Sequence, residues 1–436
     1  MKSRVYSTVE QFKEQNAELK TDLPISDDNS VLCQKVKIGN LELSNRLVCQ
    51  AMEGCDGTAD GRPDDLTVRR YERLSKGGAG LIWFEATAVC NEGRANPRQL
   101  YINEKNLDDF KKIVENIKRW GMKENGYEPA VIMQATHSGR YSKPEGKPAP
   151  IIAYNNPIFE KDNPIDKSRI ITDEGLDRVH ESLVHAAGLA KEAGFDGVDI
   201  KCCHRYLNSE LLSAFTREGR YGGSFENRTR LLRESVRDSI SLCGDGFTVT
   251  SRMNVYDGFP YPYGFGVKEG EGITPDFSEA DRLIKELAEL GVKLLDITMG
   301  NPYFNPHVNR PYAAGGYEPP EHPLCGVARM LKGTAKLGKA NPDVSLICSG
   351  LSFLGAAAPG VAAAFIEEGG FSLAGFGRMI FAYPDFAKDI VNGRFDPKKI
   401  CIACSKCTEI MRAGGTPGCI VRDGETYMPI YKKYCK

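Results

Sequence analysis

Eight short apolar segments, each followed by a longer segment of helical spacing, most constrain the fold of this 436-residue chain. The apolar segments are RLVCQ at 46, AGLIWFEA at 79, PAVIMQA at 129, DGVDIK at 196, FTVTSR at 247, KLLDIT at 293, VSLICS at 344 and FSLAGFG at 371. Strands that are apolar throughout and alternate with helices indicate a parallel sheet buried on both faces. Eight such units predict an α/β fold of the closed (β/α)8 or TIM barrel type, with an open doubly wound sheet as the alternative.

The rest of the chain divides around this repeat. We expect a helical extension over residues 1–30, the barrel over 31–395 and a cysteine-rich tail over 396–436. Two long connections, at about residues 137–170 and at 299–323, follow the third and sixth predicted strands. Both therefore overhang the carboxyl ends of the strands, where barrel enzymes hold their substrates.

Charge and hydropathy exclude several kinds of partner. The net charge is -1, so the chain has no basic footprint for nucleic acid. No signal peptide and no membrane-spanning stretch is evident, which predicts a cytoplasmic protein without a membrane partner. In that reducing compartment the 14 cysteines are expected to be buried or metal-bound and not paired in disulfides.

Polar groups gather where the predicted strands end. Lys201, His204 and Tyr206 follow the fourth strand, and three polar groups together at a barrel mouth favour a functional role. Glycines at the ends of strands seven and eight, together with Arg378, are typical of the barrel phosphate site. Tight packing is the alternative for these glycines, and a Rossmann fingerprint is excluded because no βαβ unit follows them. The phosphate site is expected to be built on these two strands and not on the tail.

The tail carries thiols at a distinctive spacing: Cys401, Cys404, Cys407 and, after a Gly-rich turn, Cys419. A short loop with three thiolates and a distant fourth suits a 4Fe-4S cluster. Four thiolates also suit zinc, although structural zinc sites more commonly use two separated CxxC pairs. Cys435 has no assigned role.

Several motifs resemble landmarks of the old yellow enzyme family of FMN oxidoreductases over about residues 31–395. They are IGNLELSNRLV, GGAGLIWFEATAV, QATHSGR, CHRYLNSELLSAFTREGRYGGSFENR and GFGRMIFAYPD. The tail resembles the branch that contains 2,4-dienoyl-CoA reductase and trimethylamine dehydrogenase, in which a 4Fe-4S cluster follows the barrel. The resemblance implies a flavin oxidoreductase that uses FMN, a cluster and either NADH or NADPH.

The resemblance also implies residue roles. The side chains that would line the flavin ring are Ala51, Met52, Glu53 and Ala86; Gln134 and Arg252 would bond its pyrimidine edge; Gly350, Gly377 and Arg378 would hold its phosphate. Lys201 and His204 would grip the carbonyl oxygen of a small-molecule substrate, and Tyr206 would donate a proton.

Three positions depart from the family pattern. Lys201 stands where His or Asn is usual, Arg205 where Gly is usual, and Glu53 where Thr or Cys is usual. We expect the charges of Glu53 and Lys201 to offset each other, leaving an ammonium that suits a carboxylate or an enolate. The alternative is that Glu53 bonds a backbone amide and Lys201 reaches into solvent.

The expected reaction is reduction of an activated carbon–carbon double bond in an unsaturated carbonyl or carboxyl compound. One alternative is a dehydrogenase or amine demethylase that passes electrons from FMN to the cluster. The other is a non-catalytic barrel with structural zinc. Larger relatives in the branch continue into nucleotide-binding domains, whereas this chain ends at Lys436. A separate flavoprotein or ferredoxin, or NAD(P)H acting directly, is therefore the expected electron donor, and a homo-oligomer is left open.

Overall fold

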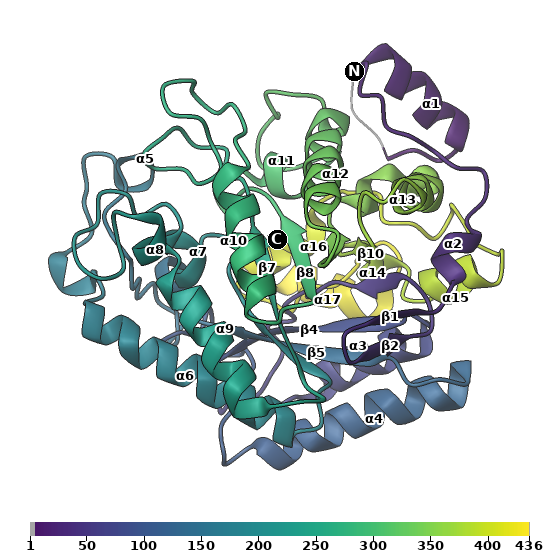
Figure 1. Cartoon of the computed structure of the whole chain (residues 1–436). Coiled ribbons are helices and arrows are strands. Elements are labelled where there is room, and N and C mark those ends of the chain that lie inside the picture. Colours follow the sequence, from purple (N-terminus) through teal and green to yellow (C-terminus); the bar gives the residue numbers. More distant parts are fainter. Residues whose placement is uncertain (1–4, 436) are drawn as a thin grey trace.

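The computed structural model describes residues 5–435 and contains a closed barrel of eight parallel strands (Figure 1). The strands are β3 (Leu47–Cys49), β4 (Leu81–Ala88), β5 (Ala130–Thr136), β6 (Gly197–Ile200), β7 (Thr248–Asn254), β8 (Leu294–Thr298), β9 (Ser345–Cys348) and β10 (Leu373–Phe376). The last strand pairs with the first, with Ala374 opposite Leu47. This closure confirms the (β/α)8 barrel and excludes the open sheet.

Helices surround the barrel because each carries one apolar stripe. In α4 the buried side chains include Phe110, Ile113, Val114 and Ile117, at the spacing of three and four that keeps them on one face. The principal outer helices are α3 (Asp65–Lys76), α4 (Leu107–Asn125), α6 (Asp173–Glu192), α9 (Arg230–Cys243), α10 (Ser278–Glu289), α12 (Pro323–Ala340), α13 (Ala358–Glu367) and α15 (Phe386–Val391). Shorter helices lie in the connections: α5 (Pro157–Glu160), α7 (Leu207–Leu211), α8 (Phe225–Arg228), α11 (Pro306–Asn309) and α14 (Met379–Ala382).

A small hairpin closes the amino end of the barrel. Its strands β1 (Val36–Ile38) and β2 (Leu41–Leu43) pair antiparallel. The buried hairpin side chains join a cluster with residues that begin the barrel strands, such as Leu81, Leu294 and Leu373. This apolar plug leaves the opposite, carboxyl end of the strands as the place for a cavity.

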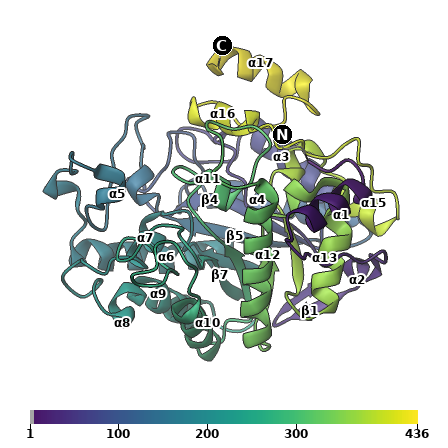
Figure 2. The ribbon, with the colours of Figure 1, turned by 90° about the horizontal axis from the view of Figure 1, so that it is seen from above.

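The tail lies over that carboxyl end. It contains α16 (Lys406–Arg412) and α17 (Gly424–Cys435), and Figure 2 shows both helices on the same side of the barrel as α11. The amide of Ala313 donates to the carbonyl of Ala403 at 3.2 Å, and Asp423 forms ion pairs with Arg69 and Arg73 of α3. The tail is thus attached to the barrel at several separate points.

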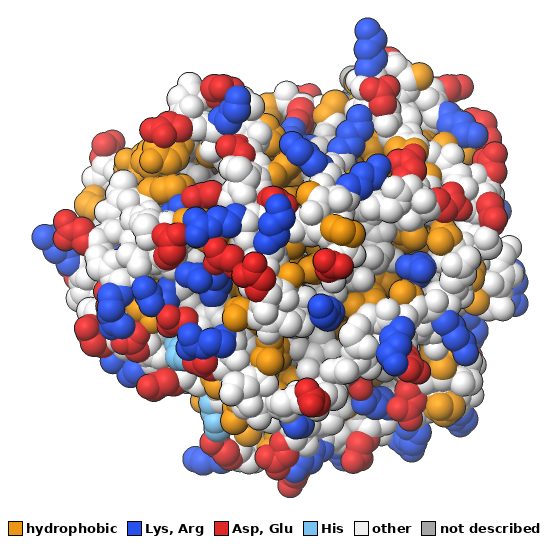
Figure 3. Space-filling view, viewed as in Figure 1, with side chains coloured by type: hydrophobic (Ala, Val, Ile, Leu, Met, Phe, Trp, Pro, Cys, Tyr) orange, Lys and Arg blue, Asp and Glu red, His pale blue; other side chains and the backbone are white. Residues whose placement is uncertain are grey.

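The amino-terminal segment packs on the side of the barrel through α1 (Val9–Glu18) and α2 (Ser30–Cys33). Phe12 of α1 is fully buried and packs edge-on against Tyr6. Within residues 5–435, none of the helices combines the length and the apolar character that crossing a bilayer demands. On the face seen in Figure 3, acidic and basic side chains are interspersed.

Candidate functional site

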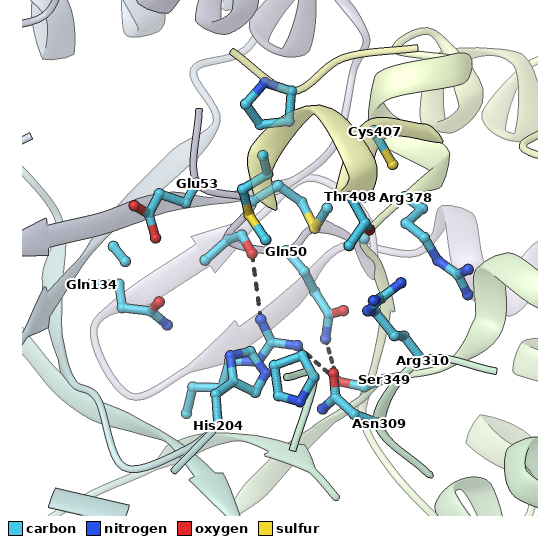
Figure 4. Close-up of a pocket in the computed structure, with 18 of the residues that line it drawn as sticks. Gln50, Glu53, Gln134, His204, Asn309, Arg310, Ser349, Arg378, Cys407 and Thr408 are labelled. Carbon is cyan, nitrogen blue, oxygen red and sulfur yellow. Dashed lines mark hydrogen bonds between the residues drawn. The ribbon is translucent and has the colours of Figure 1, made fainter. Parts of the chain in front are cut away.

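A cavity with an empty volume of about 1010 Å³ opens at the carboxyl end of the barrel (Figure 4). Every residue that the sequence analysis assigned to the flavin or the substrate lines this one cavity: Ala51, Met52, Glu53, Ala86, Gln134, Lys201, His204, Tyr206, Arg252, Gly350, Gly377 and Arg378. The fold therefore brings together side chains that are up to 327 positions apart in the chain, from residue 51 to residue 378.

The floor of the cavity is a buried polar network. Arg252 Nε forms an ion pair with Asp296 Oδ2 at 3.0 Å, although its geometry is not that of a hydrogen bond. Gln50 Nε2 donates to Asp296 Oδ1 at 2.9 Å and to Ser349 Oγ at 2.6 Å. Burial raises the pKa of Asp296 to about 6 against the opposing charge of Arg252. These bonds fix the Arg252 guanidinium below the open space.

Gln134 and Lys201 stand around a second buried acid, Asp199. Its carboxylate accepts hydrogen bonds from Gln134 Nε2 at 2.6 Å, from Trp83 Nε1 at 2.8 Å and from the Arg252 amide at 2.7 Å. Burial nevertheless raises the pKa of Asp199. The Gln134 amide is thereby oriented, with its carbonyl oxygen left for another partner.

One end of the cavity is strongly basic. Figure 4 shows Arg310 and Arg378 there, with Cys407 and Thr408 nearby and Glu53 at the opposite end. The Nη1 atoms of both arginines are buried without a hydrogen-bond partner, and burial together with the charge of Arg378 lowers the pKa of Arg310 to about 10. Two guanidiniums whose Nη1 donors are buried and unpaired within the described residues fit a phosphate dianion.

Two glycines keep the basic end open. Gly350 has φ 97°, which side chains rarely adopt, and a Cβ on it would lie 3.2 Å from Met330 Sδ. A Cβ on Gly377 would lie 3.4 Å from Met52 Sδ. Both glycines line the cavity, and a backbone without side chains suits a phosphate cradle.

Glu53 lies at the end of the cavity opposite the two arginines, on a loop that is anchored through the next residue, Gly54. The amide of Gly54 donates to Glu85 Oε2 at 2.6 Å, and Arg70 pairs with Glu85 in turn. Asn96 Nδ2 donates to Glu53 Oε1 at 2.9 Å. Burial raises the pKa of Glu53, and the charge of Lys201 is the largest opposing influence.

Lys201 and Glu53 do not form a contact pair. Among residues 5–435 no ion pair within 4.0 Å joins them, so any offset of their charges acts at longer range. The alternative expectation is wrong, because Lys201 is only 5% exposed and Glu53 bonds the side chain of Asn96, not a backbone amide. Lys201 Nζ lies 3.7 Å from the centroid of the Tyr206 ring.

Tyr206 belongs to a group of three tyrosines above the cavity. Its hydroxyl is 2.9 Å from the hydroxyl of Tyr303, whose ring stacks on Tyr141 at 4.0 Å between centroids. Burial raises the pKa of Tyr206 well above its ordinary value, so the phenol keeps its proton. Burial, aided by the charge of Arg252, lowers the pKa of His204 well below its ordinary value, so the imidazole is neutral.

The backbone before Tyr206 is unusual. His204 has φ 65° and Arg205 has φ 58°, a region that favours glycine and is often occupied at functional sites. Arg205 is fully buried, pairs with Asp257 at 2.9 Å and lies 5.3 Å from the ring centroid of Phe159. Arginine therefore replaces glycine here because its side chain points away from the cavity into a complementary buried site.

The four tail cysteines line one smaller space with an empty volume of about 390 Å³. They are Cys401, Cys404, Cys407 and Cys419. Burial raises the pKa of the Cys401 thiol to about 12 and also raises that of Cys407 and Cys419. A metal centre would supply the positive charge that such buried thiolates need.

The spacing of the sulfur atoms bears on which metal fits. Among the described residues, only Cys90, Glu92 and His137 bring three donor atoms within 4.8 Å of one another. In a zinc tetrahedron, Zn–S bonds of about 2.3 Å put the sulfurs roughly 3.8 Å apart. The tail thiols are therefore spread more widely than four ligands of one zinc ion. In the Cys90 group, His137 Nδ1 accepts from the Gly139 amide at 3.1 Å, which leaves Nε2 protonated and disfavours a metal there.

The tail also forms part of the first cavity, and the expectation that the phosphate region is independent of it is wrong. Cys407, Thr408, Met411 and Pro417 line the same space as Arg378. Cys407 and Arg378 in turn line the smaller cysteine space. The reason is that α16 crosses the barrel mouth, which the spacing of the cysteines alone does not reveal.

Other lining residues were missed by the sequence analysis, among them Gln50, Tyr303, Asn309, Arg310, Ser349 and Ser352. Tyr303, Asn309 and Arg310 lie on the connection after β8, which was expected to overhang the mouth. Its richness in Gly, Pro and aromatic residues indicated the segment but not the individual side chains.

Comparison with known proteins identifies relatives of this chain. The family model described as the NADH:flavin oxidoreductase / NADH oxidase family matches residues 32–396. The NADPH dehydrogenase of Clostridium acetobutylicum is 29% identical over 266 residues, which cover 60% of this chain and 72% of that protein. The NADH oxidase of Thermoanaerobacter brockii is 26% identical over 381 residues, which cover 85% of this chain and 52% of that protein.

Solved structures share the fold at low identity. A complex of 2-naphthoyl-CoA reductase with 2-naphthoyl-CoA has a TM-score of 0.74 at 22% identity and covers 94% of this chain. Morphinone reductase with tetrahydroNAD has a TM-score of 0.62 at 22% identity and covers 83% of this chain and 91% of that one. This chain spans 58% of the length of the 2-naphthoyl-CoA reductase chain.

Proposed function

The chain belongs to the NADH:flavin oxidoreductase / NADH oxidase family and is a flavin oxidoreductase, and from this premise we propose that it is an FMN-dependent reductase of activated carbon–carbon double bonds. The observation that carries the proposal is the cavity itself. The cavity has a basic end formed by Arg310 and Arg378 and a polar floor that orients Arg252. Lys201 and His204, which would bind the substrate oxygen, line it together with the protonated phenol of Tyr206. The family implies FMN and a nicotinamide cofactor as electron source.

The residues present fit FMN. The free Nη1 donors of Arg310 and Arg378 and the open backbone at Gly350 would hold the phosphate. Gln134 and Arg252, oriented by Asp199 and Asp296, would bond the polar edge of the ring. Ala51, Met52, Glu53, Ala86 and Gly377 would line the rest of the cofactor site.

FMN held by these residues would, when reduced, supply the hydride that the β-carbon of the substrate accepts. Lys201 and neutral His204 stabilise the negative charge that develops on the substrate oxygen, His204 by donating a ring N–H. Tyr206 gives its hydroxyl proton to the α-carbon, so that the double bond becomes a single bond with one hydrogen added at each carbon. The Tyr206 oxygen then regains a proton through Tyr303, whose hydroxyl is 2.9 Å away.

We assign a 4Fe-4S cluster to the tail thiols, Cys401, Cys404, Cys407 and Cys419. Two features support it over zinc: the wide spacing of the sulfurs and the close triple of cysteines. Cys407 and Arg378 border both cavities, so a cluster there would lie next to the flavin. The electron donor would be NAD(P)H acting on FMN, or a flavoprotein or ferredoxin acting through the cluster.

Oxidation of an amine is the second candidate, since a histamine dehydrogenase shares the fold at a TM-score of 0.68. The ammonium of Lys201 speaks against a cationic amine, because the amine would meet the positive charges of Lys201 and Arg252 in the same cavity. The reductase is therefore favoured.

Anaerobic purification tests both cofactors at once. The expected protein is brown, contains iron and sulfide, and shows a flavin spectrum that bleaches with NADH or NADPH and recovers on addition of an unsaturated carbonyl compound. Bleaching by amines, with no recovery on addition of alkenes, would support the dehydrogenase. A colourless protein with stoichiometric zinc would identify a non-catalytic barrel.

A further inference from the structure

Lys201 is a buried cation that no group of the protein neutralises by contact. Its side chain is 5% exposed, and its ammonium has neither a hydrogen bond nor an ion pair with any residue between 5 and 435. Its Nζ atom lies 3.7 Å from the centroid of the Tyr206 ring. An isolated buried ammonium is costly, and burial lowers the pKa of Lys201 although the charges of Glu53 and Asp199 oppose that shift from beyond contact distance. An anion in the adjoining cavity would stabilise the ammonium directly.

The two nearest acids are committed to other partners. Glu53 accepts from Asn96 Nδ2 at 2.9 Å, on a loop anchored through Gly54. Asp199 already accepts three hydrogen bonds, at 2.6 to 2.8 Å, from Gln134, Trp83 and an amide. Asp199 is thus occupied by other donors and Glu53 Oε1 by Asn96, and neither carboxylate forms an ion pair with Lys201 within 4.0 Å among residues 5–435, so the ammonium remains available to a ligand.

The position of Lys201 fixes which part of a substrate it meets. The ammonium rests on the face of Tyr206, the phenol proposed to protonate the α-carbon, and this contact partly stabilises the charge. A group attached to the α-carbon would therefore lie beside Lys201. A free carboxylate is a weak activating group, and an ammonium that neutralises it would make the β-carbon a better hydride acceptor.

We infer that Lys201 forms an anion subsite and that the substrate is an α,β-unsaturated carboxylate. The inference rests on the proposed function and narrows its substrate class from unsaturated carbonyl compounds in general. A carboxylate gains a charge-assisted hydrogen bond from the ammonium, whereas a neutral amide or thioester carbonyl of the same shape gains a weaker one. Lys201 is the residue that sets this preference.

The test compares two ligands of the same shape, the anionic cinnamate and the neutral cinnamamide. Each is titrated into the oxidised, FMN-loaded full-length protein without a reductant, and the dissociation constant is read from the change in flavin absorbance. The wild-type protein should bind cinnamate about 10- to 100-fold more tightly than cinnamamide, the range expected of a charge-assisted hydrogen bond. Equal affinities, or tighter binding of the amide, would overturn the inference.

Substitutions of Lys201 show whether its ammonium causes the preference for cinnamate. Lys201→Met should weaken cinnamate roughly 10- to 100-fold and cinnamamide several-fold less, whereas Lys201→Arg should keep a preference for cinnamate. Lys111→Met removes a charge at the surface and should leave both constants unchanged. Equal weakening of both ligands in Lys201→Met would show that Lys201 acts on the flavin and overturn the anion subsite. Should Lys201→Met not take up FMN, Lys201→Gln replaces it with the same criteria.

Measurements of turnover distinguish a failure of this inference from a failure of the proposed function. A protein that prefers cinnamate in binding but reduces neither compound, nor 2-cyclohexenone, would keep the anion subsite and lose the reductase. A protein that reduces cinnamamide and 2-cyclohexenone but shows no charge preference would remain a reductase and lose the anion subsite.

Discussion

At the scale of single residues, the segment His204–Arg205–Tyr206, which follows β6, directs its first and third side chains to the cavity and its second away from it. Two consecutive residues with positive φ turn the chain so that His204 and Tyr206 line the cavity while Arg205 enters the protein. Non-glycine residues in this conformation each cost on the order of 1 kcal/mol. The buried pair of Arg205 with Asp257 offsets that cost and holds the turn.

Arg205→Gly tests this account. The variant restores the residue usual in the family and relieves the backbone, but it leaves Asp257 buried without its partner. We expect a loss of about 3–5 kcal/mol in the free energy of unfolding, measured by denaturant titration. Adding Asp257→Asn should recover part of the loss. A variant as stable as the wild type would show that the pair does not support the turn.

Tyr206→Phe tests the proton donor. Reduction of the flavin by NAD(P)H should be almost unchanged, whereas its reoxidation by an unsaturated substrate should slow by about 10²- to 10⁴-fold, the usual contribution of a positioned acid. Stopped-flow absorbance measures each half-reaction separately. Tyr303→Phe is the control, because it removes the hydroxyl next to Tyr206 but keeps the donor itself, and it should slow reoxidation much less. Equal rates in Tyr206→Phe and wild type would remove Tyr206 from the mechanism.

At the scale of elements, α16 connects the two cavities. Cys407 and Thr408, in its first turn, border the cavity that also contains Arg378, and Met411 lies one turn further on. Loss of a metal from the cysteine space would therefore loosen the helix that closes the flavin space.

Cys404→Ser should consequently lose iron and also bind FMN more weakly, by about 10-fold or more. Iron analysis and the fluorescence of released flavin measure the two effects. Cys435→Ser, at the far end of α17, is the matched control and should change neither. Loss of iron with fully retained FMN affinity would show that α16 does not depend on the metal centre.

The barrel and half of the residues that line the first cavity were predictable because their signals are local. Alternating strands and helices and the motif residues at strand ends can be read from neighbouring positions, as at Lys201 and Arg378. The contribution of Arg310, Tyr303 and α16 was not predictable, because loops without regular spacing reach the cavity only through tertiary packing. The hydrogen bond from Asn96 to Glu53 was likewise not predictable, because no local pattern indicates the approach of these two residues.

At the scale of the whole molecule, the tail is tied to the barrel by Asp423. Burial acts to raise the pKa of this carboxyl, but the hydrogen bond from Arg69 and the charges of Arg73 and Arg69 leave it below the ordinary value of 3.8. A depressed pKa stabilises the attached state above the ordinary value, and this stabilisation is lost as the pH falls through the lower, folded-state value.

Asp423→Asn should therefore remove the charge of this side chain at neutral pH, as strong acid does in the wild-type protein. We expect faster cleavage of residues 396–436 by a protease and faster release of FMN, both by several-fold, with the barrel still folded by circular dichroism. Asp245→Asn, in the exposed turn before β7, is a control of equal charge change. Unchanged proteolysis and unchanged FMN release would show that other contacts alone hold the tail.

Because the tail covers the barrel mouth, its position at the end of the chain also determines when the flavin site is covered during synthesis. The residues proposed to hold FMN are complete once Arg378 has been made, whereas Cys407, Thr408, Met411 and Pro417 emerge from the ribosome later. For that interval the barrel can close around its strands while its mouth stands open. The flavin can thus bind to the nascent barrel before the tail residues that line the same cavity have been made.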